Sequence, residues 1–257
     1  MTAAFRQTWQ VYLRGVRTLL RQPAFLLITI VQPIVWLLLF GALFKAVARI
    51  PGFRGTYIDF LTPGVVVMLA VFGAGWSGMA FVEDIANGVM DRMLASPVWR
   101  GALNVGWVAY EAFAVMVQTV LIVILALLLG ADFKGGVIGV IVMFFIGALL
   151  ASVVASLSNA VGVLGRQRET VIGVVSFFQL PLTFLSTGMM QKNLLPHWMQ
   201  TVAKFNPVNW AVVAARAAAM QKTNWGVVGT HVALLAALAV IAGFVASRAF
   251  ARYQRSL

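Results

Sequence analysis

Long runs of apolar residues dominate the chain, and the short stretches between them carry nearly all of the charges. An α-helix needs about 20 consecutive apolar residues to cross the hydrocarbon core of a bilayer. Six segments approach or exceed this length, so the pattern predicts an all-α membrane protein, with residues 1–257 forming a single transmembrane domain. The predicted spans are residues 24–44, 58–82, 103–129, 135–164, 170–190 and 225–247.

The segment before the first span, residues 3–22, has an amphipathic pattern. Aromatic and aliphatic side chains recur at helical spacing, and arginines line the opposite face. A basic amphipathic helix of this kind lies in the plane of the membrane interface. We therefore expect an interfacial helix that either anchors the chain or acts as an elbow moving with the first span. Its apolar face comprises Phe5, Trp9, Tyr12, Val16, Leu19 and Leu20.

Charges gather in the connection between the second and third predicted spans, residues 83–101. Three of the seven acidic residues lie there together with Arg92, and the apolar side chains between them form one helical stripe that ends at Leu94. The helix should stop before Pro97, because the residue that precedes a proline is disfavoured in the α region. We expect a short charged helix at the cytoplasmic membrane surface, which is either a contact for a soluble partner or a solvated connection.

The connection between the fifth and sixth spans is half apolar and is interrupted by Pro196 and Pro207. Neither of its apolar stretches is long or uncharged enough to cross a bilayer as a helix. The pattern predicts two short interfacial or re-entrant helices on the extracellular face, the second of them over residues 208–220.

Composition strengthens the membrane prediction. Hydrophobic residues make up 61% of the 257 residues and charged residues only 10%, whereas soluble domains are about 45–50% apolar and about 25% charged. The formal net charge is +12, which in a soluble protein would suggest nucleic-acid binding. Here the basic residues flank the apolar segments, so the lipid bilayer accounts for them and no nucleic-acid partner is expected.

The distribution of Lys and Arg sets the expected orientation. With the N-terminus inside, 11 of the 19 basic residues fall on the cytoplasmic side and eight on the other. Because the cytoplasmic loops of membrane proteins carry the excess of basic residues, we expect both termini of this multi-pass chain in the cytoplasm.

Residues suited to catalysis or metal binding are scarce. The chain has no cysteine, and His197 and His231 lie far apart in the sequence without clustered acids. No phosphate-binding loop of the Gly-x-x-x-x-Gly-Lys-Ser/Thr type is present. We therefore expect no catalytic residue, no metal site and no cofactor on this chain.

Glu111 is the one acid well inside a predicted span, about two turns from its start. An ionisable residue in such a position is a functional candidate, for example as a proton carrier. One hypothesis is therefore a proton-coupled secondary transporter that uses Glu111. Another is a membrane protein without transport activity, such as an embedded enzyme or an assembly scaffold, although the sequence offers it neither an acid pair nor a metal cluster.

Four stretches, in register along nearly the whole chain, resemble the ABC type-2 export permeases. The likeness is strongest to the drug- and antibiotic-resistance branch typified by daunorubicin-resistance permeases. The stretches are Gln32-Pro33-Ile-Val-Trp-Leu-Leu-Leu-Phe-Gly41; Gly88 with Asp91-Arg92-Met-Leu-Ala-Ser96-Pro97; Pro181-Leu-Thr-Phe-Leu-Ser-Thr-Gly188 with Leu195-Pro196-His-Trp198-Met; and Asn206-Pro207 with Arg216.

The resemblance implies a six-span permease of the plasma membrane that exports hydrophobic or amphipathic molecules by alternating access. ATP and Mg would be bound by a separate ATP-binding subunit, present in two copies per transporter. Two permease chains would pair, with a homodimer expected and a sister permease as the alternative partner. Residues 83–101 would form the coupling helix that contacts the ATPase. The implied ATPase-coupling residues are Glu83, Asp84, Gly88, Asp91, Arg92, Leu94, Ser96 and Pro97.

By the same likeness, the substrate path runs along the dimer interface and is lined by the first, second and fifth spans. Aromatic and methionine side chains there suit a large apolar ligand. The implied pathway residues are Gln32, Met68, Phe72, Trp76, Met79, Phe177, Phe178, Gln179 and Phe184.

Overall fold

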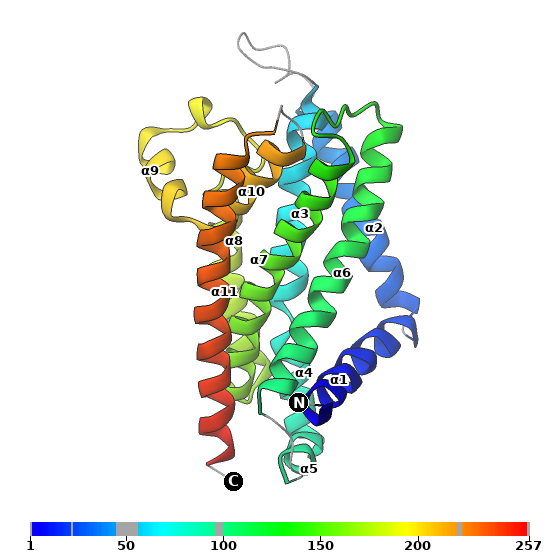
Figure 1. Cartoon of the computed structure of the whole chain (residues 1–257), viewed down its shortest axis with the longest axis vertical. Coiled ribbons are helices and arrows are strands. Elements are labelled where there is room, and N and C mark those ends of the chain that lie inside the picture. The colour runs from blue at the N-terminus through cyan, green and yellow to red at the C-terminus, as the bar shows by residue number, and fades with distance from the viewer. Residues whose placement is uncertain (1, 22, 45–55, 96–99, 220–222, 256–257) are drawn as a thin grey trace.

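The computed structural model describes residues 2–21, 23–44, 56–95, 100–219 and 223–255, in which every regular element is a helix. These helices form a bundle in which the long ones run roughly parallel to one long axis, while α1 crosses it obliquely near one end (Figure 1). They are α1 Thr2–Arg21, α2 Pro23–Leu43, α3 Tyr57–Gly75, α4 Gly78–Ala86, α5 Val89–Ala95, α6 Arg100–Leu128, α7 Gly136–Gly165, α8 Arg168–Phe184, the 3₁₀ turn η2 Lys192–Leu194, α9 His197–Phe205, α10 Pro207–Ala219 and α11 Trp225–Gln254.

Four helical stretches in the described residues are long and apolar enough to cross a bilayer. They are Tyr57–Ala86, which joins α3 and α4, together with Gly101–Leu128, Gly136–Gly165 and Trp225–Gln254; a shorter apolar stretch, Ile30–Leu43, belongs to α2. These helices confirm the prediction of an all-helical, integral membrane protein.

The predicted fifth span, residues 170–190, was too long. α8 ends at Phe184, and residues 185–191 form a non-helical segment. Asn206 stabilises this end, because its side-chain amide donates to the carbonyls of Leu182 (2.7 Å) and Leu185 (3.0 Å) that the terminated helix leaves free. Apolar composition alone could not reveal a stop that depends on a distant asparagine.

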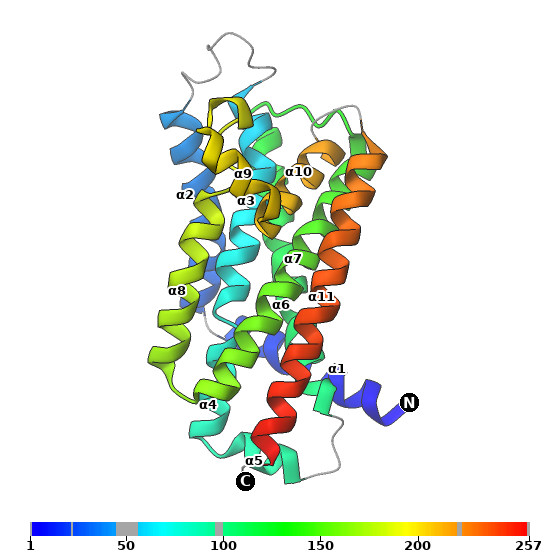
Figure 2. The same ribbon diagram turned by 90° about the vertical axis from the view of Figure 1, so that its left-hand side faces the viewer.

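α7 is the central helix of the bundle. It packs against α3, α4, α6, α8, α10 and α11, and Figures 1 and 2 show it enclosed by its neighbours from two directions. Ala148, Ser156 and Ala160 are spaced along one buried face of it. Small residues at such spacing let neighbouring helices approach closely, which is how helices in membranes gain contact.

The second span is broken between α3 and α4, at Trp76 and Ser77. The backbone groups that the break releases are bound by one residue of α7. The Ser158 hydroxyl accepts a hydrogen bond from the Gly78 amide (3.0 Å) and donates one to the Gly75 carbonyl. Irregular backbone is tolerated in a membrane only where the protein itself satisfies its polar groups, so Ser158 makes this break possible.

Two further contacts fasten the break. Asn159 accepts a hydrogen bond from the Ser77 hydroxyl (2.8 Å) and donates one to the Asn104 side chain on α6 (2.9 Å). Gly78 and Gly162 also bring the backbones of α4 and α7 together, because a Cβ on either glycine would press against the carbonyl of the other helix. The break therefore fixes α3–α4 to both α6 and α7.

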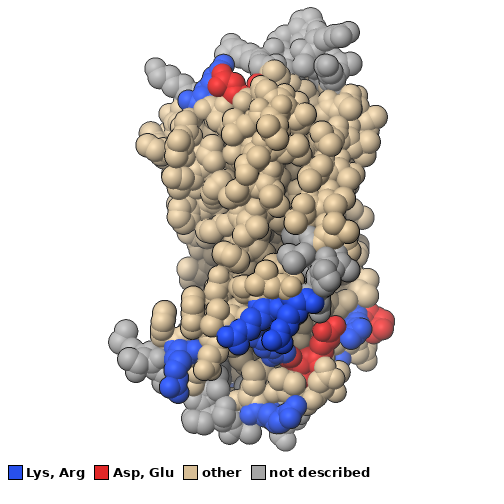
Figure 3. Space-filling view, turned by 90° about the vertical axis from the view of Figure 1, so that its right-hand side faces the viewer, with Lys and Arg blue, Asp and Glu red and all other residues tan. Residues whose placement is uncertain are grey.

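Charged side chains are concentrated at the two ends of the molecule. Figure 3 shows Lys, Arg, Asp and Glu grouped around one end, a broad uncharged band, and a small group of charges at the opposite end. We call the first the α5 end and the second the α10 end, after the helices found there (Figure 1). This distribution is the one expected of a bundle whose middle lies in hydrocarbon.

Replacing Gly78 with alanine should destabilise the bundle. The added Cβ would press against the Ser158 carbonyl on α7, so the two helices would have to separate. Overpacking of this kind costs about 1–3 kcal/mol. We expect a lower midpoint of thermal unfolding for Gly78→Ala, measured by size-exclusion chromatography of heated protein in detergent.

The matched control is Gly243→Ala on α11, where an added Cβ meets nothing within 4 Å. Because alanine favours a helix over glycine by about 0.5–1 kcal/mol, this variant should keep or raise the midpoint. A midpoint for Gly78→Ala no lower than that of the wild type would contradict the close contact between α4 and α7.

Candidate functional site

The last turn of α4 carries two of the predicted coupling residues, and both are engaged within the chain. Asp84 is buried and pairs with Arg14 of α1 through both carboxylate oxygens, one of them at 3.0 Å. Glu83 is exposed and pairs with Arg168 at the start of α8, at 3.2 Å. These acids therefore connect α4 to α1 and to α8.

The expected helix beginning at Glu83 is instead divided in two. α4 ends at Ala86, Gly88 adopts a positive φ of 63°, and α5 begins at Val89. A glycine in the left-handed conformation commonly ends a helix, because it has no Cβ to strain that backbone. Glu83 and Asp84 accordingly lie at the end of the second span rather than on the short helix that follows it.

The short helix α5 is anchored by Met90, which is fully buried in a cluster that includes Phe81, Leu103 and Tyr253. Arg92 is exposed, and its Nε donates to the Gly88 carbonyl at 3.2 Å. Of the other predicted coupling residues, Asp91 and Leu94 belong to α5, with side chains outside the described part, and Ser96 and Pro97 lie outside the described residues.

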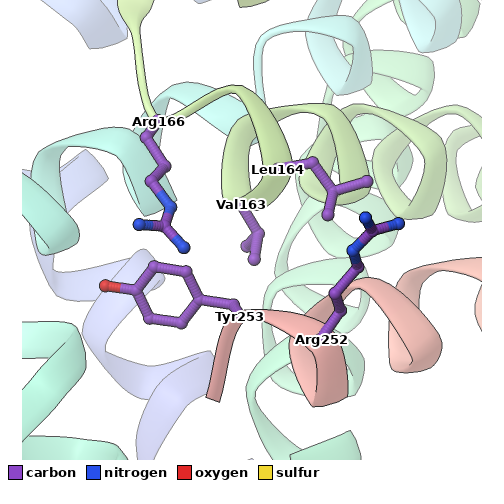
Figure 4. Close-up of a pocket in the computed structure, with 5 residues that line it drawn as sticks. All are labelled: Val163, Leu164, Arg166, Arg252 and Tyr253. Atoms are coloured by element: carbon purple, nitrogen blue, oxygen red, sulfur yellow. The ribbon is translucent and has the colours of Figure 1, made fainter. Parts of the chain in front are cut away.

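A basic hollow of about 380 Å³ adjoins this region, where α7 ends and α11 approaches its own end. Figure 4 shows the Arg166 side chain reaching over the Tyr253 ring, with Arg252 on the other side of Val163 and Leu164. The Arg166 guanidinium carbon lies 4.6 Å from the ring centroid. The hollow adds two positive charges to the α5 end.

A larger cavity of about 440 Å³ lies between α1, α2, α3, α4 and α6. Because Thr18 and Leu19 of α1 and Met79 and Ala80 of α4 contribute to its wall, it lies toward the α5 end rather than the α10 end. Four of the nine predicted pathway residues line it: Gln32, Phe72, Trp76 and Met79.

The other five predicted pathway residues do not reach this cavity. Met68 and Gln179 are buried. The side-chain amide of Gln179 on α8 donates a hydrogen bond to the Val71 carbonyl on α3, at 3.4 Å. Phe177, Phe178 and Phe184 are exposed on α8. α8 directs these aromatic side chains away from the bundle of its own chain. Because the predicted path runs between two permease chains, its lining by all nine residues stays a prediction.

The sequence prediction missed most of the third span's contribution to the cavity. Trp107, Glu111, Ala114 and Gln118 recur at helical spacing on one face of α6 and line the wall together with Tyr110. The spacing of this stripe is visible in the sequence, but spacing alone does not show that the stripe faces a cavity. The structure places Glu111 beside aromatic residues from α3 and α6.

A partly buried arginine organises the α10 end. Arg216 donates from Nη2 to the carbonyls of Phe60 (3.0 Å), Thr187 (3.1 Å) and Gly188 (3.2 Å), and its guanidinium carbon lies 3.6 Å from the centroid of the Phe60 ring. This single side chain joins α10 to α3 and to the segment after α8.

Among the described residues no group of three or more His, Asp or Glu could hold a metal ion.

The comparison with known families decides the identity of this membrane bundle. A family model described as "ABC-2 type transporter" matches residues 6–220, which include most of α1, the cavity and the Arg216 contacts. The chain belongs to the ABC-2 type transporter family. The resemblance read from the four sequence stretches is thereby confirmed.

Several relatives of this ABC-2 protein carry names that concern transport. Daunorubicin resistance ABC transporter permease protein DrrB1 of Streptomyces coeruleorubidus is 31% identical over 199 residues, 76% of this chain and 68% of the relative. Putative transport permease ycf38 of Porphyra purpurea is 28% identical over 242 residues, 88% and 82% of the two chains. Probable doxorubicin resistance ABC transporter permease protein DrrC of Mycobacterium tuberculosis is 27% identical over 160 residues, 60% and 58%.

Neutralising Asp84 should destabilise this ABC-2 chain more than neutralising Glu83. Asp84→Asn leaves Arg14 without its buried partner, and losing a charged hydrogen-bonded partner costs about 1–3 kcal/mol. Glu83→Gln removes an exposed pair worth about 0–1 kcal/mol. We expect a clearly lower thermal unfolding midpoint for Asp84→Asn and a nearly unchanged one for Glu83→Gln. Equal midpoints would show that the Arg14 pair does not hold α1 against α4.

Proposed function

We propose that the chain is the transmembrane permease subunit of an ATP-driven exporter of hydrophobic or amphipathic molecules, such as drugs, antibiotics or lipid-like compounds. Membership of the ABC-2 family supports this, as do the relatives named as drug-resistance permeases. In the proposed topology, residues 1–257 form one domain of the plasma membrane with cytoplasmic termini. Six spans would cross: α2, α3–α4, α6, α7, α8 and α11.

ATP hydrolysis would take place on a separate subunit that binds ATP and Mg, because this sequence has no phosphate-binding loop. We propose two such subunits and two permease chains per transporter, with a homodimer as the expected pairing. The exposed aromatic residues of α8, Phe177, Phe178 and Phe184, support a path that a second permease chain would complete.

The observation that carries the proposal is the way α5 is attached to the rest of the chain. α5 follows directly from the second span, Met90 buries it in the core, and Asp84 ties the preceding turn to α1. A force applied to α5 would therefore reach α1 and the wall of the cavity. An ATPase can bias two membrane conformations only through such a differential contact.

Reversing the charges on α5 should release the ATPase. We propose co-expressing the tagged chain with the ATP-binding subunit of its own organism, extracting both in mild detergent and measuring the co-purified subunit by mass spectrometry. The wild type should retain a stoichiometric subunit, and the double variant Asp91→Arg with Arg92→Asp should lose most of it, because an interface rejects like charges placed opposite each other.

The control makes the same exchange at the opposite end of the molecule. Asp132 and Lys134 are exposed between α6 and α7, at the α10 end, so Asp132→Lys with Lys134→Asp should retain the subunit. A wild-type chain that captures no ATPase under these conditions would contradict the exporter proposal. Equal retention by both double variants would remove α5 from the interface.

The proton-coupled carrier remains the second candidate, and the position of Glu111 in a cavity favours it. The two functions differ in their energy source. In vesicles containing the chain with its ATPase, an exporter should be stopped by vanadate and continue after a protonophore collapses the proton gradient. A carrier should show the reverse dependence.

A further inference from the structure

The wall of the 440 Å³ cavity combines one acid with several aromatic side chains. Glu111 contributes its carboxyl group, and Phe72, Trp76, Trp107 and Tyr110 contribute rings. None of the described residues that line the cavity is basic, and among the described residues no salt bridge involves Glu111. The one acidic side chain in this wall therefore has no cationic partner in the described lining.

A second polar group in the same wall also favours a ligand with an electropositive group. The side-chain oxygen of Gln118, two turns along α6 from Glu111, is buried without a hydrogen-bond partner. A carboxylate and an amide oxygen are both acceptors. An electropositive group entering the cavity would satisfy both, whereas an anion would meet repulsion from Glu111.

The aromatic residues strengthen this preference. The face of an aromatic ring carries negative charge density and attracts a cation placed over it, most strongly for tryptophan. Trp107 and Tyr110 of α6 are buried, and Trp76, directly after α3, is 40% exposed, so rings from two parts of the chain border the same space. The volume falls within the range of about 300–1,000 Å³ typical of sites for drug-sized ligands.

We propose that this cavity is a binding site for bulky lipophilic cations, with Glu111 as the counter-ion and the aromatic residues as the walls. The proposal deepens the proposed function and rests on it, because it assigns the class of substrate that the permease would admit. Neutral lipids and lipophilic anions would be disfavoured at this site.

Tetraphenylphosphonium and tetraphenylborate provide a direct test, because they have nearly the same size and shape but opposite charges. We propose measuring the binding of each radiolabelled ion to the purified full chain in lipid nanodiscs, with empty nanodiscs subtracted. Tetraphenylphosphonium has no transferable proton, so its binding reports a counter-ion and not a proton carrier.

The expected result is saturable binding of the cation at one site and no saturable binding of the anion. Glu111→Gln, which keeps the shape but removes the charge, should weaken cation binding at least about tenfold, because it removes the Coulomb attraction between the carboxylate and the cation. Glu111→Asp should recover most of the affinity. The matched control Glu169→Gln, at an exposed acid on α8, should bind as the wild type does.

A second variant tests the walls independently of the carboxylate. Trp76→Leu should weaken cation binding several-fold, because it removes one aromatic face and leaves an apolar side chain in its place. Each variant is compared only if it elutes as a single peak and unfolds at a temperature close to that of the wild type. If Glu111→Gln does not fold, Trp76→Leu and Glu111→Asp still decide the proposal.

Unchanged cation binding by both Glu111→Gln and Trp76→Leu would overturn the proposal, as would equal binding of the two ions by the wild type. If Glu111→Gln binds the cation as the wild type does but loses proton-driven transport in vesicles, Glu111 would be assigned to proton coupling instead. Because the measurement uses the permease alone, its failure is distinct from failure of the exporter proposal, which the ATPase co-purification tests.

Discussion

Hydrocarbon offers no partner to a free backbone amide or carbonyl, and the arrangement of this bundle depends on how that constraint is met at one place. The second span breaks at Trp76 and Ser77, and α7 supplies Ser158 and Asn159 to bind what the break exposes. Ser158 binds the Gly78 amide and the Gly75 carbonyl, and Asn159 binds the Ser77 hydroxyl. With them, α4 can take its own direction and still remain packed against α7.

The break has consequences at both of its ends. On the α3 side, Trp76 lines the cavity. On the α4 side, Asp84 pairs with Arg14 of α1, and α5 follows the end of α4. One span therefore carries the wall of the candidate binding site and the attachment of the candidate coupling helix. A rearrangement at α5 has a short, continuous route to the cavity through α4, with the pair between Asp84 and Arg14 as its connection to the interfacial helix.

The sequence predicted the helices for which length and lack of charge are sufficient. α6 and α7 contain all but one residue of their expected ranges, and α11 contains the whole of its range and continues to Gln254. It failed where a boundary depends on a distant partner. Residues 185–190 are uncharged and therefore fell within the predicted span, but Asn206 binds carbonyls at the end of α8. Periodicity placed Trp107, Glu111 and Gln118 on one face of α6, yet only packing shows that this face borders a cavity. A pattern is local, whereas caps and cavities depend on residues far apart in the sequence.

Two partly buried ionisable side chains in the described part of the chain, Arg216 and Glu111, are treated in opposite ways. Arg216 meets three carbonyl oxygens and the face of Phe60, so its charge is used within the fold to hold the α10 end together. Glu111 borders a cavity whose described lining offers it no positive charge. A charge kept from water is costly unless it is paired. The fold provides a set of partners for Arg216 and leaves Glu111 facing space, which is what a site that receives its cation from outside requires.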